Sequence, residues 1–103
     1  MEDFVKVAKR GDVAPGEMKL VDVGNEQVVL ANVGIAIVAF NNVCPHAECD
    51  LAFGALEGEE LECDCHGSRF NVRTGELLNG PALEPLTVYT VRLEGDDILV
   101  GPA

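Results

Sequence analysis

The sequence predicts an all-β protein, built as an antiparallel β-sandwich or barrel of short strands. Short apolar runs of β character recur along the 103 residues, and helical periodicity is hard to find anywhere in the chain. Turn signals rich in glycine and asparagine separate these runs, as in hairpin loops that join antiparallel strands. The length is close to the commonest size of one compact unit, so we expect a single domain over residues 1–103.

The expected strands lie in two groups, one before and one after a central segment. They cover residues 4–8, 18–23, 27–33, 35–40, 86–93 and 98–100. Residues 86–93 alternate between two faces, with Leu86 and Val88 on one side and Tyr89 and Val91 on the other. Neither face is cleanly polar, which is typical of a sandwich or a small barrel. The turns are expected at Pro15-Gly16, Gly24-Asn25, Gly34, Thr74-Gly75, Asn79-Gly80-Pro81 and residues 94–97.

The central segment has a different composition. Between residues 43 and 81 the strand pattern gives way to loops rich in glycine, glutamate and cysteine. We therefore expect residues 44–81 to form a small subdomain that is inserted into the β framework.

The acidic balance of the chain restricts its partners. A formal net charge of −11 disfavours nucleic acid and anionic membranes as partners, because both require the opposite sign. A protein with a basic docking surface is the natural counterpart. An acidic surface that only keeps the protein in solution is an equally good explanation of the charge.

No part of the sequence resembles a membrane anchor or a targeting signal. The longest apolar stretch, residues 28–43, does not reach the ~20 residues that span a bilayer. It is interrupted by Asn32, Gly34, Asn41 and Asn42. The chain opens with Met1-Glu2-Asp3, whereas a secretory signal opens with a positive region and an apolar run. These patterns predict a cytoplasmic protein with no membrane partner.

All the histidines and cysteines of the chain are close together in the sequence. The two histidines and four cysteines lie between positions 44 and 66. Two loops that each offer a thiolate and an imidazole can close on one metal site. The two groups read Cys44-Pro45-His46-Ala47-Glu48-Cys49 and Cys63-Asp64-Cys65-His66-Gly67-Ser68.

The pattern Cys-x-His, followed after 16 residues by Cys-x-x-His, resembles the ligand motif of the Rieske iron-sulfur family. A Rieske centre holds one 2Fe-2S cluster, with two thiolates on one iron and two imidazoles on the other. The resemblance implies that Cys44 and Cys63 bind one iron, and that His46 and His66 bind the other. It also implies a Rieske-like fold, with residues 44–81 as a cluster-binding subdomain, and a role as a one-electron carrier.

The mixed ligand set changes the charge of the cluster. An oxidised 2Fe-2S core of charge +2 is neutral with two thiolates, whereas four thiolates would leave it at −2, so the mixed site accepts an electron more easily. Rieske centres accordingly have potentials of roughly −150 to +300 mV, against about −400 mV for plant-type ferredoxins. The second nitrogen of each imidazole can also take up a proton when the cluster is reduced.

The other two cysteines also match positions known in the family. Cys49 and Cys65 stand where some Rieske proteins, notably the high-potential ones, have a disulfide that ties the two cluster loops together. The resemblance therefore implies this bridge. Two unpaired thiols packed as small apolar groups are the alternative, because disulfides are unusual in the cytosol.

Residues that flank the second ligand loop carry further resemblance. Gly67 and Ser68 extend the loop, and a serine at this position in Rieske proteins donates its hydroxyl to a cluster sulfide, which stabilises the reduced state. Quinol-oxidising members have a tyrosine two residues later, where this chain has Phe70. The resemblance implies a reduction potential in the middle of the family range.

Pro81, in Asn79-Gly80-Pro81, resembles the proline loop that covers a third side of the cluster in Rieske proteins. An ordinary turn between strands fits this segment nearly as well.

Seven carboxylates lie between Cys44 and His66, in a segment that contains no basic residue. They could steer a basic partner toward the histidines, and they would slightly disfavour the added electron. A solvated acidic face without a partner role is the alternative. The seven residues are Glu48, Asp50, Glu57, Glu59, Glu60, Glu62 and Asp64.

Two other functions would use the same residues. Zinc could bind the four ligands tetrahedrally, but zinc fingers pair two cysteines in one element and two histidines in another, whereas each loop here mixes the two. A thiol redox enzyme built on Cys63 and Cys65 is disfavoured, because the cluster loop and its bridge already account for both cysteines.

Within the Rieske family, the resemblance favours a ferredoxin that carries electrons from a reductase to a terminal oxygenase. No histidine remains for the mononuclear iron of an oxygenase subunit, so the chain is not expected to be an enzyme by itself. The alternatives are a small subunit of a nitrite-reductase-like enzyme and an independent carrier from a thermophile or archaeon, because most oxygenase ferredoxins lack the extra cysteine pair. A carrier that docks with two partners is expected to be a monomer.

Overall fold

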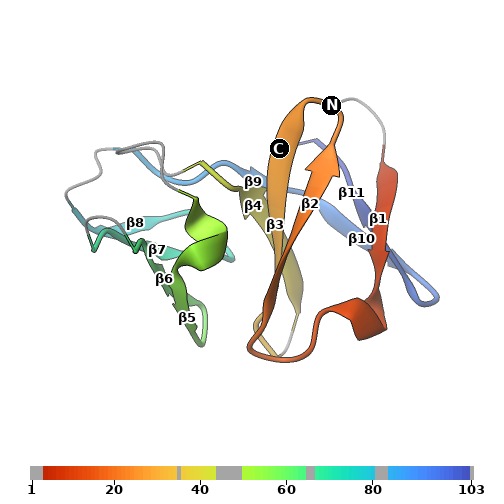
Figure 1. Cartoon of the computed structure of the whole chain (residues 1–103), viewed down its shortest axis with the longest axis horizontal. Coiled ribbons are helices and arrows are strands. Elements are labelled where there is room, and N and C mark those ends of the chain that lie inside the picture. The colour runs from red at the N-terminus through yellow and green to blue at the C-terminus, as the bar shows by residue number, and fades with distance from the viewer. Residues whose placement is uncertain (1–3, 35, 44–49, 65–66, 81–83, 103) are drawn as a thin grey trace.

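Three antiparallel sheets make up the protein, which confirms the all-β prediction (Figure 1). The structure is a computed structural model, and it describes residues 4–34, 36–43, 50–64, 67–80 and 84–102. The elements are β1 (Val5–Lys9), η1 (Arg10–Asp12), β2 (Met18–Val23), β3 (Glu26–Asn32), β4 (Ile37–Asn41), η2 (Leu51–Phe53), β5 (Ala55–Glu57), β6 (Glu60–Glu62), β7 (Arg69–Asn71), β8 (Leu77–Asn79), β9 (Val88–Tyr89), β10 (Val91–Glu94) and β11 (Asp97–Val100).

The sheets have the strand orders β1-β11-β10, β2-β3-β4-β9 and β5-β6-β7-β8. Five of the expected strands coincide with β1, β2, β3, β4 and β11 to within two residues at either end. Both short helices, η1 and η2, are of the 3-10 type. No helix among the described residues has the length and apolar character that crossing a membrane requires.

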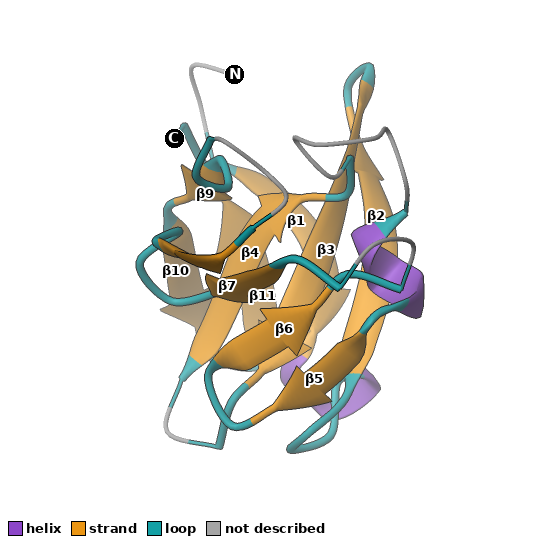
Figure 2. Ribbon diagram, turned by 90° about the vertical axis from the view of Figure 1, so that its left-hand side faces the viewer, coloured by secondary structure: helices purple, strands orange, loops and turns teal. Residues whose placement is uncertain are grey.

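β3 and β4 lie at the centre of the molecule and are covered on both faces. Val29 and Ala31 of β3 point into one core, and Val28 and Leu30 point into the other. Figure 2 shows the reason, since β5, β6 and β7 lie in front of these strands and β1 and β11 lie behind them. A strand covered on both faces reads as a continuous apolar run, as residues 28–31 do.

The sixth expected strand, residues 86–93, is divided where the chain changes sheets. β9 pairs with β4, whereas β10 pairs with β11. Thr90 lies at this corner, and its N–H donates to the carbonyl oxygen of Pro102 at 3.0 Å instead of to a strand partner. The predicted alternation still holds across the corner, because Val88 packs against one core and Val91 against the other.

The sequence did not predict the four strands of the third sheet, which were expected as loops. β5, β6, β7 and β8 have three residues each, too few to display an alternating pattern. Gly58, at φ +62°, opens the two-residue turn between β5 and β6, where only glycine adopts this conformation without strain. Leu61 and Phe70 are paired across β6 and β7, and both are fully buried against the central strands.

A close contact joins the third sheet to the β framework. Gly75, in the turn between β7 and β8, accepts a hydrogen bond at 2.9 Å from the N–H of Leu86. A Cβ atom at Gly75 would lie 2.8 Å from the carbonyl oxygen of Leu86 and 2.9 Å from a methyl group of Val88. The residue also has φ +84°, so both space and backbone conformation require glycine here.

Candidate metal centre

The first candidate ligand loop is held at both ends. Val43 and Asp50 form an antiparallel bridge, and the N–H of Leu51 donates to the carbonyl oxygen of Asn42 at 2.7 Å. The predicted residues Cys44, His46 and Cys49 lie between these ends, outside the described residues. The two ends of the loop are therefore hydrogen-bonded to each other where the chain leaves β4 and enters η2. Residues 42–43 and 50–51 are called the root of the first loop.

Asn42 connects this root to the central sheet. Its side chain is fully buried; Oδ1 accepts from the N–H of Ala52 at 3.0 Å, and Nδ2 donates to Oε1 of Gln27 at 3.2 Å. A buried amide with both ends satisfied holds its neighbours in one arrangement. Sequence reasoning missed this residue, although a polar side chain between an apolar strand and a ligand loop was a usable signal.

The second candidate loop is closed by two backbone hydrogen bonds. The N–H of Cys63 donates to the carbonyl oxygen of Ser68 at 2.8 Å, and the N–H of Gly67 donates to the carbonyl oxygen of Cys63 at 3.0 Å. Gly67 has φ +77°, a conformation that glycine adopts at little cost. Cys65 and His66 lie outside the described residues, within this loop.

The described residues of the second loop are buried. Cys63 is 1% exposed and packs in the apolar core with Leu51 and Phe70. Ser68 is fully buried, and its carbonyl oxygen accepts the hydrogen bond from the N–H of Cys63. The side chain of Phe70 also lies in this core. Phe70 is the residue that stands where quinol-oxidising Rieske proteins have a tyrosine. Pro81 lies outside the described residues, just beyond β8.

The segments that flank the two loops touch each other, and the root of the second loop consists of Glu62, at the end of β6, and Cys63. Gly54, which follows η2, packs so closely on the end of β6 that a Cβ atom there would lie 2.5 Å from the carbonyl oxygen of Glu62. Glu62 directly precedes Cys63, and Gly54 lies only five positions after Cys49 of the first loop. Only glycine allows this approach, which the sequence reasoning did not anticipate.

The arrangement fits a metal cluster with mixed ligands. Two segments, one with Cys-x-His and the other with Cys-x-x-His, begin at adjoining roots. Apolar side chains shield Cys63 from water. Such surroundings disfavour an unpaired thiolate, so a bound metal ion would supply the charge that stabilises it. The donor set of two cysteines and two histidines matches that of a Rieske centre.

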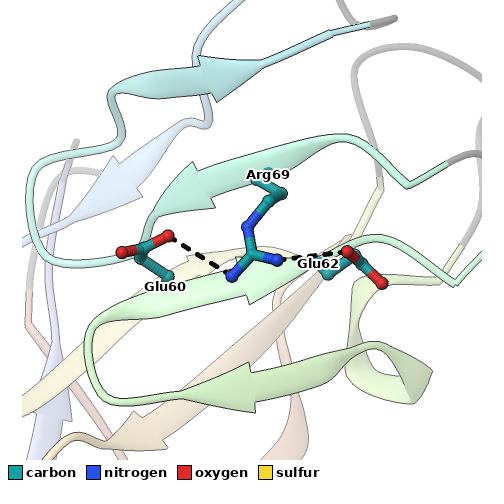
Figure 3. A network of polar contacts seen from close by, with 3 residues as sticks. All are labelled: Glu60, Glu62 and Arg69. Carbon is teal, nitrogen blue, oxygen red and sulfur yellow. Dashed lines mark hydrogen bonds and ion pairs between the residues drawn. The ribbon is translucent and has the colours of Figure 1, made fainter.

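The acidic stretch between the loops is partly neutralised, which the sequence did not predict. Arg69 of β7 makes ion pairs with Glu60 at 3.4 Å and Glu62 at 3.2 Å (Figure 3). Arg73 makes an ion pair with Glu59 at 3.3 Å. Both arginines follow the segment in the sequence and reach it only because β6 and β7 pair. The segment itself contains no basic residue, and the counter-charges for these three carboxylates come from beyond it.

The comparisons with known proteins agree with this geometry. The family model described as the Rieske [2Fe-2S] domain matches residues 3–90. The chain belongs to the Rieske family. Its cofactor is accordingly a Rieske-type 2Fe-2S cluster, and its role is that of a one-electron carrier. When bound, the cluster accepts and releases a single electron, while the protein supplies the ligands and the surroundings.

Three relatives of this Rieske protein match it over almost their whole length. The ferredoxin component of biphenyl 2,3-dioxygenase from Rhodococcus jostii is 43% identical over 97 residues, covering 94% of this chain and 91% of that protein. The solved ferredoxin of carbazole 1,9a-dioxygenase from Nocardioides aromaticivorans is 36% identical, with a TM-score of 0.92 over 99% of this chain and 100% of the other. A chain in the complex of reduced oxygenase and oxidized ferredoxin in carbazole 1,9a-dioxygenase is 31% identical, with a TM-score of 0.91 over 98% and 94% of the two chains.

Proposed function

We propose that this Rieske protein is the ferredoxin component of a ring-hydroxylating dioxygenase system. In this role it accepts single electrons from a reductase and passes them to a terminal oxygenase, and it catalyses no reaction by itself. The similarity to the biphenyl dioxygenase ferredoxin carries the proposal, because it extends over 94% of this chain and 91% of the relative.

The cluster ligands in this proposal are Cys44 and Cys63 on one iron and His46 and His66 on the other. Burial of Cys63 and the contact between the two loop roots support this assignment. Residues 44–81 act as the cluster-binding subdomain. The Ser68 hydroxyl serves as a donor to the cluster. The remaining proposed parts of this site are the Cys49 and Cys65 disulfide between the loops, and Gly67, Phe70 and Pro81 around the cluster.

The docking surface for both partners lies at the loop roots. Phe53 of η2 is 73% exposed, which is unusual for an aromatic side chain, and it follows the first ligand loop by four residues. Asp50 and Asp64 are exposed on the two loops, and among the described residues neither has an ion-pair partner. An exposed aromatic ring together with exposed carboxylates suits a partner surface with an apolar recess and a basic rim. A monomer leaves this surface available to each partner in turn.

Electron transfer to an oxygenase tests the proposal directly. The reduced protein is mixed without oxygen with the terminal oxygenases of the biphenyl, naphthalene and 3-phenylpropionate dioxygenase systems. Reoxidation is followed by the cluster absorbance and by electron paramagnetic resonance. We expect at least one oxygenase to take up the electron in a step whose rate rises with oxygenase concentration.

Two results would count against the proposal. A reduced protein without the anisotropic resonance of a histidine-ligated cluster would remove the proposed ligand set. A protein that has this resonance but keeps its electron with all three oxygenases would contradict the role in ring hydroxylation. Plant-type ferredoxin, matched for reduction state, is the control for nonspecific electron transfer.

A further inference from the structure

Arg69 occupies a special place on the hairpin that carries the second ligand loop. Its Cα is directly opposite that of Glu62 in the pairing of β7 with β6. The next pair of residues toward the loop is Ser68 and Cys63, which are joined by a backbone hydrogen bond of 2.8 Å. Arg69 and Glu62 therefore form the last pair of the ladder before the proposed ligands.

One guanidinium group connects two carboxylates of β6. Nη1 of Arg69 lies 3.2 Å from Oε1 of Glu62, and Nη2 lies 3.4 Å from Oε1 of Glu60. The two glutamates share a face because side chains two positions apart on a strand point the same way. Figure 3 shows the arginine between them. Leu61, the residue between the two glutamates, points the other way and is buried.

Among the described residues, Arg69 is the cation that pairs with these two carboxylates. Glu60, Glu62 and Arg69 together carry a local charge of −1, which becomes −2 without the guanidinium. Arginine keeps its charge at every accessible pH, so this contribution is constant. The three side chains are about half or less exposed, so mobile ions screen the charges only in part.

We propose that Arg69 raises the reduction potential of the cluster by neutralising the carboxylates next to the second ligand loop. Reduction adds one negative charge to the cluster, and a neighbouring carboxylate without a counter-charge opposes that step. Arg69 acts through its field and is not a ligand. The inference rests on the proposed assignment of Cys63 and His66 as ligands.

Arg73 provides a matched control within the same hairpin. It makes the same kind of ion pair, with Glu59 at 3.3 Å, but at the end of β6 that is remote from the ligand loop. Glu59 directly precedes β6 and lies three positions before Glu62, or about 10 Å at ~3.3 Å per residue. This separation is about one Debye length at 0.1 M salt, so the remote pair is largely screened from the loop.

The experiment compares the reduction potentials of the cluster-loaded wild type, R69Q and R73Q at 0.1 M and 1 M salt. We expect R69Q to have a lower potential than the wild type, with a shift at least about twice that of R73Q at low salt. The R69Q shift should shrink to less than about half at 1 M salt, where the Debye length is about 3 Å. The resonance of the reduced cluster should stay unchanged in both variants.

Compensating variants separate charge from structure. The double variant E62Q/R69Q has the local charge of the wild type, so its potential should return toward the wild-type value although the ion pairs are gone. R69K retains the charge and should also remain close to the wild type. If R69Q does not fold, E60Q/E62Q tests the same idea in the opposite direction and should raise the potential.

The proposal is overturned if R69Q leaves the potential unchanged, if R73Q shifts it equally, or if E62Q/R69Q fails to restore it. Loss of the Rieske resonance in the wild type would instead overturn the ligand assignment. The two failures are therefore distinguishable, because an unchanged potential with an intact resonance counts only against Arg69.

Discussion

Replacing Asn42 with alanine should destabilise the protein and loosen the root of the first ligand loop. The fully buried amide accepts from the N–H of Ala52 at 3.0 Å and donates to Gln27 at 3.2 Å. A net hydrogen bond contributes about 1 kcal/mol, and a polar group left unpaired away from water costs a further ~1–3 kcal/mol. The Ala52 N–H is the group left unpaired, since the exposed Gln27 side chain can turn to water. We therefore expect a loss of about 2–4 kcal/mol.

Thermal unfolding at a fixed scan rate measures this loss. For a domain of this size, each kcal/mol lowers Tm by about 4 °C or more, so N42A should unfold at least about 8 °C below the wild type. Q27A is the comparison variant. It removes the partner of the Asn42 Nδ2 donor, but Gln27 lies at the surface, so water can enter the space it leaves and accept that hydrogen bond, and the loss should stay below about 1.5 kcal/mol. N42A should also release its cluster to a chelator faster than Q27A. Equal Tm values for N42A and Q27A would refute the assigned role of the buried amide.

Two further predictions concern the framework. G75A should lose about 2–4 kcal/mol in urea unfolding, because its Cβ would lie 2.8 Å from the carbonyl oxygen of Leu86 at φ +84°. G95A is the control, because Gly95 has φ +60° and a Cβ atom there would meet nothing within 4 Å; an equal loss in both variants would contradict the crowding at Gly75. Burial of Tyr89, together with its hydrogen bond to Glu26, raises the pKa of the phenol above 10.0. Because the unfolded tyrosine ionises first, stability should fall as the pH rises above that value. The tyrosinate absorbance of this single tyrosine should show the higher midpoint, and E26Q should lower it; a midpoint at or below about 10 would contradict this.

The family and its cofactor could be predicted from the sequence because the ligand pattern is local. Cys44 and His46 are two residues apart, and Cys63 and His66 are three apart, so each pair belongs to one loop whatever the rest of the chain does. The central strands were equally readable. β3 is covered on both faces, and burial of every side chain leaves a continuous apolar run.

The third sheet and its charges were decided only by the tertiary structure. Strands of three residues show no periodicity, so β5 to β8 read as loops until pairing and packing on the core defined them. Seven carboxylates in a segment without a basic residue were consistent with a docking face for a basic partner or with a solvated acidic face. Pairing of β6 with β7 placed Arg69 beside two of them and Arg73 near a third.

The difference between these outcomes has a physical reason. A metal-ligand motif is specified by residue type and short spacing along the chain, which are properties of the sequence itself. The field at the proposed cluster site depends on charges brought together across a hairpin, and the close approach of Gly54 to Glu62 depends on two segments meeting in space. The sequence alone therefore determined what the protein holds, whereas the tertiary structure decided the electrostatic surroundings in which it is held.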